Sequence, residues 1–238
     1  MTAKAPLLRL ALLSLLLIAS SAAPFVSAEE PCQGDECCIC DHGKSQSPID
    51  IVNVTRAHLP RLDFHYNSPV PVDVVASSTK KRIDVTFVGV RPTLTIGSET
   101  FILDGLHFHS PGEHEIRGAG AAMEMHLVHH NQAGELGVVG VLMKPVAGRP
   151  NPLIARLWAN AGSEPTRMEI RTSNLLPADR RYYRYAGSLT TPPCAEGVRW
   201  HVLRGELIVS PEQVSTYPFP NTARATQPLN GRPVLESQ

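Results

Sequence analysis

The chain has 238 residues, with 22 basic and 22 acidic side chains, and 5% of its residues are aromatic. This balance offers no basic patch for a nucleic acid and no acidic run of the kind found in solvating tails, so neither role is expected. Beyond its N-terminal end, no apolar run approaches the ~18 residues of a membrane-spanning helix.

The first 28 residues have the pattern of a secretory signal peptide. Lys4 and Arg9 precede an apolar run that is too short to span a bilayer, and small residues at 26–28 suit a signal peptidase. An uncleaved membrane anchor is the alternative. Cleavage would leave one secreted or periplasmic domain, residues 29–238, that needs no membrane.

Four of the five cysteines cluster in or next to a short N-terminal extension, residues 29–39. They are Cys32, Cys37, Cys38 and Cys40, and the fifth, Cys194, lies far along the chain. The cluster alone could suggest a metal site, but disulfides are the better expectation in a secreted chain. Asn53-Val54-Thr55 is an N-glycosylation acceptor, usable only in a host that glycosylates secreted proteins.

The next part of the chain alternates apolar and polar residues in short runs separated by turn-forming Gly, Pro, Ser and Lys. This pattern is typical of a mostly antiparallel β structure. The expected strands are 72–75, 83–88, 93–96 and 100–103. Further on, residues 135–145 read as an apolar strand, and 151–161 as a short packing helix with Asn151 as its N-cap.

Six of the ten histidines fall between residues 104 and 131. His107 and His109 flank one phenylalanine, so in a strand their rings project to the same side. A second strand over 123–128 would present His126 on one face, and pairing of the two strands would bring the three rings together. A single histidine on an apolar strand is more often a core residue than a ligand. Three at this spacing, without cysteine, instead favour a catalytic zinc site with one open position.

A cupin site is an alternative for the same stretch. Its H-x-H-x3-E-x6-G pattern is met by His107, His109, Glu113 and Gly120. The match is incomplete, because Phe101 stands where a glycine is expected and no P-x-G-x2-H element follows.

Motifs outside the histidine stretch decide between these readings. Residues 46–51 read QSPIDI, residues 187–194 read GSLTTPPC ahead of Val198 and Trp200, and residues 227–232 read QPLNGR. With HFH and MEMHLVH they resemble, in order, the alpha class of carbonic anhydrases from about Cys40 to the end of the chain. The resemblance implies a large twisted, mainly antiparallel sheet with short peripheral helices.

The resemblance also implies the chemistry. His107, His109 and His126 would bind Zn²⁺, and hydroxide on the zinc would attack carbon dioxide to give bicarbonate and a proton. Thr190 would accept a hydrogen bond from the hydroxide and donate one to Glu113, while Glu124 would orient His126. An apolar substrate pocket would be formed by Val128, Val138, Leu189, Thr191, Val198 and Trp200.

The resemblance further implies a disulfide between Cys40 and Cys194. The sequence departs from the family pattern at two positions near the metal: Lys81 stands where a proton-shuttling histidine is usual, and Gly105 where a glutamine usually bonds the first ligand histidine. With a pKa near ~10.4, a solvated lysine is poorly suited to shuttling at neutral pH, so slow proton export is expected. The usual aromatic N-terminal segment is absent, and prolines in 211–225 indicate that a helix common there is lost.

Two other functions remain as alternatives. The first is a secreted zinc-binding or matrix module on the same fold with little turnover, which the missing histidine and glutamine would suit. The second is a metal-dependent cupin oxidase. The sequence does not specify an oligomeric state.

Overall fold

The computed structural model describes residues 39–238. The expected signal peptide over 1–28, most of the cysteine-rich extension, and Cys32, Cys37 and Cys38 lie outside the described residues. In the described part, no helix is long and apolar enough to cross a membrane.

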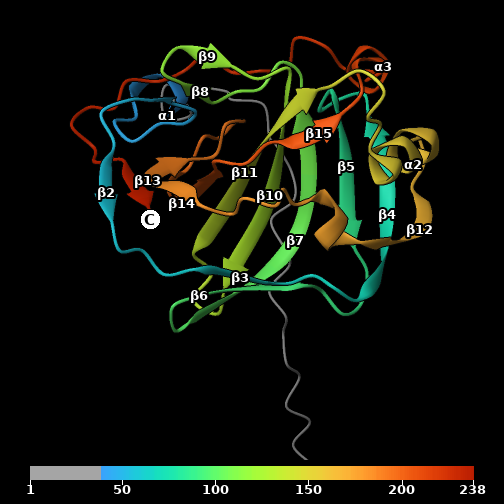
Figure 1. Ribbon diagram of the computed structural model, residues 1–238, viewed down its shortest axis with the longest axis horizontal. Helices are drawn as coiled ribbons and strands as arrows, with labels where there is room; N and C mark the ends of the chain where they lie inside the picture. The colour runs from blue at the N-terminus through green and yellow to red at the C-terminus, as the bar shows by residue number, and fades with distance from the viewer. Residues whose placement is uncertain (1–38) are drawn as a thin grey trace, which may run out of the picture. The chain divides into compact units, whose positions relative to one another are not determined.

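A 13-stranded twisted sheet dominates the described part of the chain (Figure 1). Ten of its strands lie side by side in the order β12-β4-β5-β7-β10-β11-β14-β13-β16-β2. In chain order these are β2 (Thr55–Ala57), β4 (Pro69–Ser77), β5 (Arg82–Phe87), β7 (Glu99–His109), β10 (Met123–Asn131), β11 (Leu136–Pro145), β12 (Thr166–Arg171), β13 (Tyr182–Ser188), β14 (Glu196–Leu203) and β16 (Leu235–Ser237). The remaining three are β3 (Leu62–His65) and β6 (Thr93–Ile96), which pair with each other, and β15 (Leu207–Val209), which pairs with β11.

The sheet is mainly antiparallel, as predicted. Every pairing from β12 through β4, β5, β7 and β10 to β11 is antiparallel. Parallel pairs occur where β11 meets β14 and β15, and where β16 meets β2. A separate small sheet joins β1 (Asp50–Ile51), β8 (Glu115–Ile116) and β9 (Ala119–Gly120). The predicted strands fall within observed strands, apart from Val88 after β5 and Glu135 before β11, and β4, β7 and β10 are longer than predicted.

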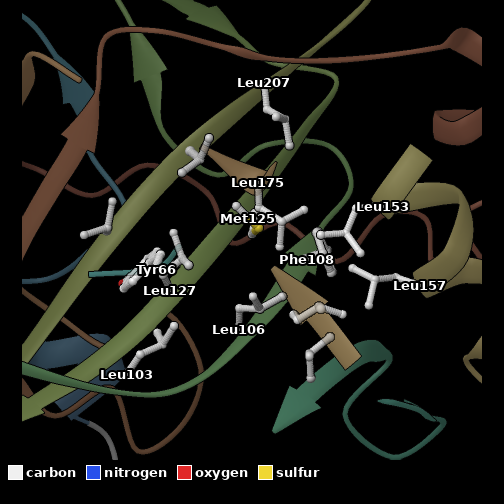
Figure 2. Packing of buried hydrophobic residues seen from close by; sticks show 14 of the residues in the cluster. Tyr66, Leu103, Leu106, Phe108, Met125, Leu127, Leu153, Leu157, Leu175 and Leu207 are labelled. Atoms are coloured by element: carbon white, nitrogen blue, oxygen red, sulfur yellow. The ribbon is translucent and has the colours of Figure 1, made fainter. Parts of the chain in front are cut away.

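The central strand β10 separates two environments. Met125 and Leu127 point into the main hydrophobic core, where Leu106 and Phe108 of β7 meet them (Figure 2). All four side chains are almost completely buried, and burial of each stabilises the fold by roughly 1.5–3 kcal/mol. Because side chains alternate along a strand, the residues between them face the other side of the sheet. The core thus holds rigidly the two strands that carry the histidines.

Short helices lie at the periphery: α1 (Ile39–His42), α2 (Pro152–Asn160), a 3₁₀ turn (Thr172–Leu175) and α3 (Pro211–Ser215). The predicted cap of α2 is present, because Asn151 accepts from the backbone N–H groups of Leu153 and Ile154 at 3.0 and 3.1 Å. The expectation that no helix remains in 211–225 was wrong. Ser210 and Gln213 form a reciprocal capping box that holds one short helix before the prolines end it.

Candidate metal centre

Three histidine rings meet on the face of β7 and β10 opposite the main core. His126 is the direct cross-strand partner of His107, and His109 lies two residues further along β7. One nitrogen from each ring can be chosen so that all three lie within 4.8 Å of one another. His109 and His126 are each 2% exposed. The strand pattern predicted this cluster, and its geometry suits a single metal ion.

The hydrogen bonds of His126 and His109 each leave one ring nitrogen available to bind a metal ion. His126 uses Nε2 to bond Oε1 of Glu124 at 3.0 Å, which leaves Nδ1 for a metal. His109 directs Nδ1 toward the carbonyl of Thr222 at 3.5 Å, while its buried Nε2 has no partner among the described residues. A buried polar atom without a partner is unfavourable unless something binds it. Three imidazole nitrogens with one further position open are a donor set that zinc prefers.

The surroundings of His107 and His109 keep these two rings neutral, the form that binds a metal. Burial, followed by the positive charge of Arg82, holds the pKa of His107 well below its usual value. Burial, followed by charge on His126, does the same to the pKa of His109. Protons therefore compete weakly for these ligand nitrogens at neutral pH.

Glu124 is the anchor of a buried hydrogen-bond network. Its Oε2 accepts from the backbone N–H groups of Glu113 and His114 at 2.8 Å each, and its Oε1 contacts Nδ1 of His114 at 2.7 Å as well as His126. Burial alone would raise the pKa of Glu124, but the charges and hydrogen bonds of His114 and His126 hold it well below its usual value. The carboxylate therefore stays ionised and fixes the orientation of His126.

His114 was missed as a site residue in the sequence. Its Nε2 contacts the hydroxyl of Tyr185 at 2.7 Å, and that hydroxyl donates to Oγ of Ser47 at 2.8 Å. The Glu113-His114 pair, three residues after the HFH motif, was the available signal. His114, Glu124 and His126 also satisfy the distances of a metal cluster. Because their polar atoms already bond one another, these residues form a positioning network rather than a second metal site.

Glu113 lies beside the histidine cluster but is held by the chain. Its Oε1 accepts from the backbone N–H of Arg224 at 2.9 Å. Burial raises the pKa of this carboxyl, while positive charge on His126, the Arg224 N–H and the nearby Thr190 hydroxyl oppose the rise. Its Oε2 is buried and has no hydrogen bond of normal geometry among the described residues. It is therefore free to accept a hydrogen bond from the adjacent Thr190 hydroxyl.

A small cavity of about 20 Å³ opens next to the rings, with room for about one water-sized molecule. It is lined by His107, His126, Val128, Val138, Leu189, Thr190, Thr191 and Trp200. Five of the six expected pocket residues therefore border it. Val198 does not border the cavity; it is buried in the hydrophobic cluster that contains Val138 and Trp200.

Comparisons with known proteins agree with this geometry. A family model described as eukaryotic-type carbonic anhydrase matches residues 32–238. The chain belongs to this family. A carbonic anhydrase of Klebsiella pneumoniae is 38% identical over 208 residues, which are 83% of this chain and 82% of that protein.

Solved structures of this family have the same architecture. The alpha-carbonic anhydrase of Photobacterium profundum superimposes with a TM-score of 0.77 at 38% identity, covering 85% of this chain and 94% of that one. A structure of dioscorin complexed with ascorbate superimposes with a TM-score of 0.76 at 32% identity, covering 84% and 89%. Carbonic anhydrases are lyases, and the fold is that of the alpha class.

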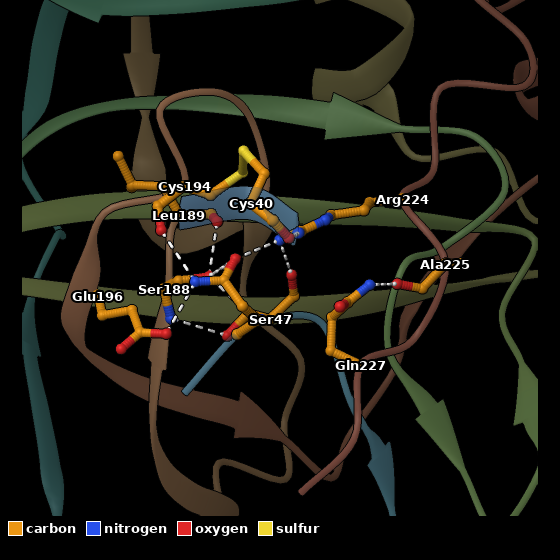
Figure 3. Close-up of a disulfide and its surroundings, with 10 residues drawn as sticks. Cys40, Ser47, Ser188, Leu189, Cys194, Glu196, Arg224, Ala225 and Gln227 are labelled. Carbon is orange, nitrogen blue, oxygen red and sulfur yellow. Dashed lines mark hydrogen bonds between the residues drawn. A yellow bond between two sulfur atoms is a disulfide. The ribbon is translucent and has the colours of Figure 1, made fainter. Parts of the chain in front are cut away.

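A disulfide joins Cys40 to Cys194, the pair that the carbonic anhydrase resemblance had implied (Figure 3). Arg224 reinforces this link. Its guanidinium donates to the carbonyls of Cys40 and Ser47 at 2.6 and 2.7 Å and to Oε1 of Gln46 at 2.9 Å. The start of the domain is thus tied both to the Thr190 loop and to the segment that holds Glu113.

The two departures from the carbonic anhydrase pattern have clear structural settings. Lys81 is exposed in the turn between β4 and β5, with φ at 49°. Gly105 lies where β5 approaches β7 closely, because a Cβ there would come within 2.9 Å of the carbonyl oxygen of Val85. The missing glutamine is therefore linked to tight packing of these two strands.

Proposed function

We propose that this protein is a zinc-dependent carbonic anhydrase that interconverts carbon dioxide and bicarbonate. The observation that carries the proposal is the buried, unpartnered Nε2 of His109, set among two further ring nitrogens and beside an apolar cavity. Family membership supports the same reaction. Zinc would be held by His107, His109 and His126.

The ion would supply the nucleophile at neutral pH. In three-histidine sites, known best from carbonic anhydrases themselves, zinc lowers the pKa of its water from 15.7 to about 7. The chain supplies the remaining control, since Glu124 holds His126, and the low pKa values of His107 and His109 keep those two rings in the neutral form that binds a metal.

Thr190 would orient the reacting oxygen. Its hydroxyl lies beside Glu113, whose unpartnered Oε2 would accept a hydrogen bond from the threonine hydroxyl. The threonine oxygen can then only accept a hydrogen bond from the nucleophile, which directs a lone pair of the nucleophile toward the cavity. The valines, Leu189 and Trp200 lining that cavity offer carbon dioxide an apolar position, while the Thr190 backbone N–H would hold an oxygen of the product.

Proton export is expected to be the weak step. Lys81 occupies the usual place of the shuttling histidine, and a solvated ammonium group has a pKa too far above neutrality for rapid exchange. Buffer in solution would take over the task.

We further propose that the protein is exported. The leader pattern at 1–28 would direct the chain out of the cytoplasm as one mature domain, and the Cys40–Cys194 disulfide suits an oxidising compartment.

Stopped-flow measurement of carbon dioxide hydration tests the reaction. The zinc-loaded protein lacking residues 1–28 would be assayed at low and high concentrations of an imidazole buffer, with His107→Ala as the control. We expect activity that rises with buffer and disappears in the variant. One bound zinc per chain without activity above the variant would contradict the enzyme proposal.

That negative outcome would leave the alternative, a secreted zinc-binding module with little turnover. One observation favours keeping it. Dioscorin, which has the same fold, has been crystallised with ascorbate, so the architecture supports ligand binding of another kind.

A further inference from the structure

A charged pair occupies the wall of the site next to the histidines. Asp84 on β5 is the direct cross-strand partner of His107 on β7, so the two side chains project to the same side of the sheet. Arg82 lies two residues before Asp84 and shares its face. Extending the register by two residues places Arg82 opposite His109. The intervening Ile83 points into the main core, which fixes this orientation.

The guanidinium of Arg82 is anchored at one nitrogen, and its other two nitrogens have no partner in the described part of the chain. Its Nε donates to Oδ1 of Asp84 at 2.8 Å, and the side chains of Arg82 and Asp84 are only 14% and 20% exposed. The two terminal nitrogens of Arg82 have no protein partner among the described residues. The positive charge of the guanidinium contributes to the low pKa of both His107 and His109. A guanidinium with free donors, fixed beside a cation site and partly shielded from water, is an attractive position for an anion.

Bicarbonate has the planar pair of oxygens that a guanidinium binds best. We propose that Arg82, positioned by Asp84, forms an anion-binding subsite that attracts bicarbonate and competing anions to the metal centre. This inference deepens the proposed function and rests on it. It assigns Arg82 to substrate recruitment in the dehydration direction and to sensitivity toward inhibitory anions, with no part in the chemical step.

Two measurements test the subsite. The first is the dissociation constant of thiocyanate for the protein loaded with Co²⁺, followed by visible absorption, which needs no turnover. The second is the split between KM and kcat for bicarbonate dehydration by the zinc-loaded protein. Arg82→Gln, Arg82→Lys and Asp84→Asn would be compared with Arg181→Gln. The control removes an arginine that also pairs with an aspartate two residues away, Asp179, and contacts no site residue in the described part.

We expect Arg82→Gln to raise both the thiocyanate dissociation constant and the bicarbonate KM about three- to tenfold, with kcat nearly unchanged. The dissociation constant and the KM of Arg82→Lys should lie between those of Arg82→Gln and the parent. Lysine keeps the positive charge but lacks the paired N–H donors of the guanidinium. Asp84→Asn should weaken anion binding less than Arg82→Gln, since it frees the arginine without removing it.

Values for Arg82→Gln equal to those for Arg181→Gln would overturn the subsite. Weakened thiocyanate binding in a protein that does not hydrate carbon dioxide would uphold the subsite and contradict only the proposed function. A chain that binds neither Co²⁺ nor Zn²⁺ would contradict both.

Discussion

Single polar side chains determine most of the site's electrostatics, and Glu124 is the clearest case. It is 0% exposed yet ionised, because two backbone N–H groups and the rings of His114 and His126 surround its oxygens. A buried carboxylate is stable only when it is paired in this way. The same contacts leave His126 with one tautomer and one orientation, so the geometry of the proposed metal site would depend on a residue that is not itself a proposed ligand.

Glu124→Gln should therefore weaken zinc binding about 10–100-fold, because an amide places an N–H where a ring N–H must donate. Competition with a chromophoric chelator measures the affinity directly. Glu169→Gln on β12 is the matched control, since Glu169 is an exposed residue in an outer strand. Equal zinc affinity in both variants would show that the network does not hold the ligand.

A buried histidine outside the metal centre makes stability depend on pH. His201 is 2% exposed, and its Nδ1 has no partner among the described residues. Burial, followed by the charges of Arg184 and His129, lowers its pKa from 6.5 to about 3. Between these values the unfolded chain binds a proton that the folded chain does not. The contribution of His201 to the free energy of unfolding is therefore fully present above pH 6.5 and is lost as the pH drops toward 3.

Replacing this ring should flatten that dependence. As the pH falls from 6.5 toward 3, the free energy of unfolding should decrease less in His201→Leu than in the parent. The difference in slope should be up to about 1.4 kcal/mol per pH unit. Urea unfolding at several pH values between 6.5 and 4 measures the slope. His65→Leu, which alters an exposed ring, should leave the slope as in the parent, and an unchanged slope in His201→Leu would refute the explanation.

At the scale of elements, the pairing of β5 with β7 limits which side chains fit beside the candidate metal site. Gly105 pairs with Thr86, and the backbone of β5 occupies the space that a side chain at 105 would need. The glutamine usual in the family at this position thus cannot simply be restored. The same close pairing brings Asp84 and Arg82 against the ligand strand.

Gly105→Gln should accordingly lower the free energy of unfolding by about 1–3 kcal/mol, because β5 must move to admit the side chain. Urea unfolding with Gly120→Gln as the control tests this, since a Cβ at Gly120 meets nothing within 4 Å. Unchanged stability together with tighter zinc binding would show instead that the family's glutamine fits.

Sequence patterns predicted elements better than contacts between them. Period-two alternation located the strands, and it placed His107 and His109 on one side of β7. The cap at Asn151 was predictable because its chemistry is local. The helix α3 was missed because its stability comes from a reciprocal Ser210–Gln213 pair, which is easily overlooked among prolines. Arg82 and Arg224 could not be found, because register and loop packing, which no local pattern encodes, bring them to the site.

At the scale of the whole molecule, one covalent link joins distant parts of the described chain. The Cys40–Cys194 disulfide spans a sequence separation of 154 and connects α1 to the loop that carries Thr190. Loop-closure entropy for that separation corresponds to about 5 kcal/mol of stability. This is a large fraction of the net stability of a typical domain.

Reducing the Cys40–Cys194 disulfide should therefore lower the midpoint temperature of unfolding markedly. Activity should decrease before the sheet unfolds, because the loop that carries Thr190 is no longer tied to α1. Calorimetry and hydration assays with and without reductant measure both effects. The Cys40→Ser/Cys194→Ser double variant is the control and should resemble the reduced parent in either condition. A midpoint in the double variant equal to that of the oxidised parent would contradict this role.

The contact between Arg224 and Glu113 has a consequence for biosynthesis. The three proposed zinc ligands are all present once residue 126 has been made, whereas the backbone N–H that holds Glu113 belongs to a residue close to the end of the chain. A growing or truncated polypeptide that ends before Arg224 would contain every zinc ligand and still lack the fixed carboxylate. In the proposed enzyme, metal capture and catalytic competence would therefore be separate events, and only a chain synthesised as far as Arg224 would achieve the second.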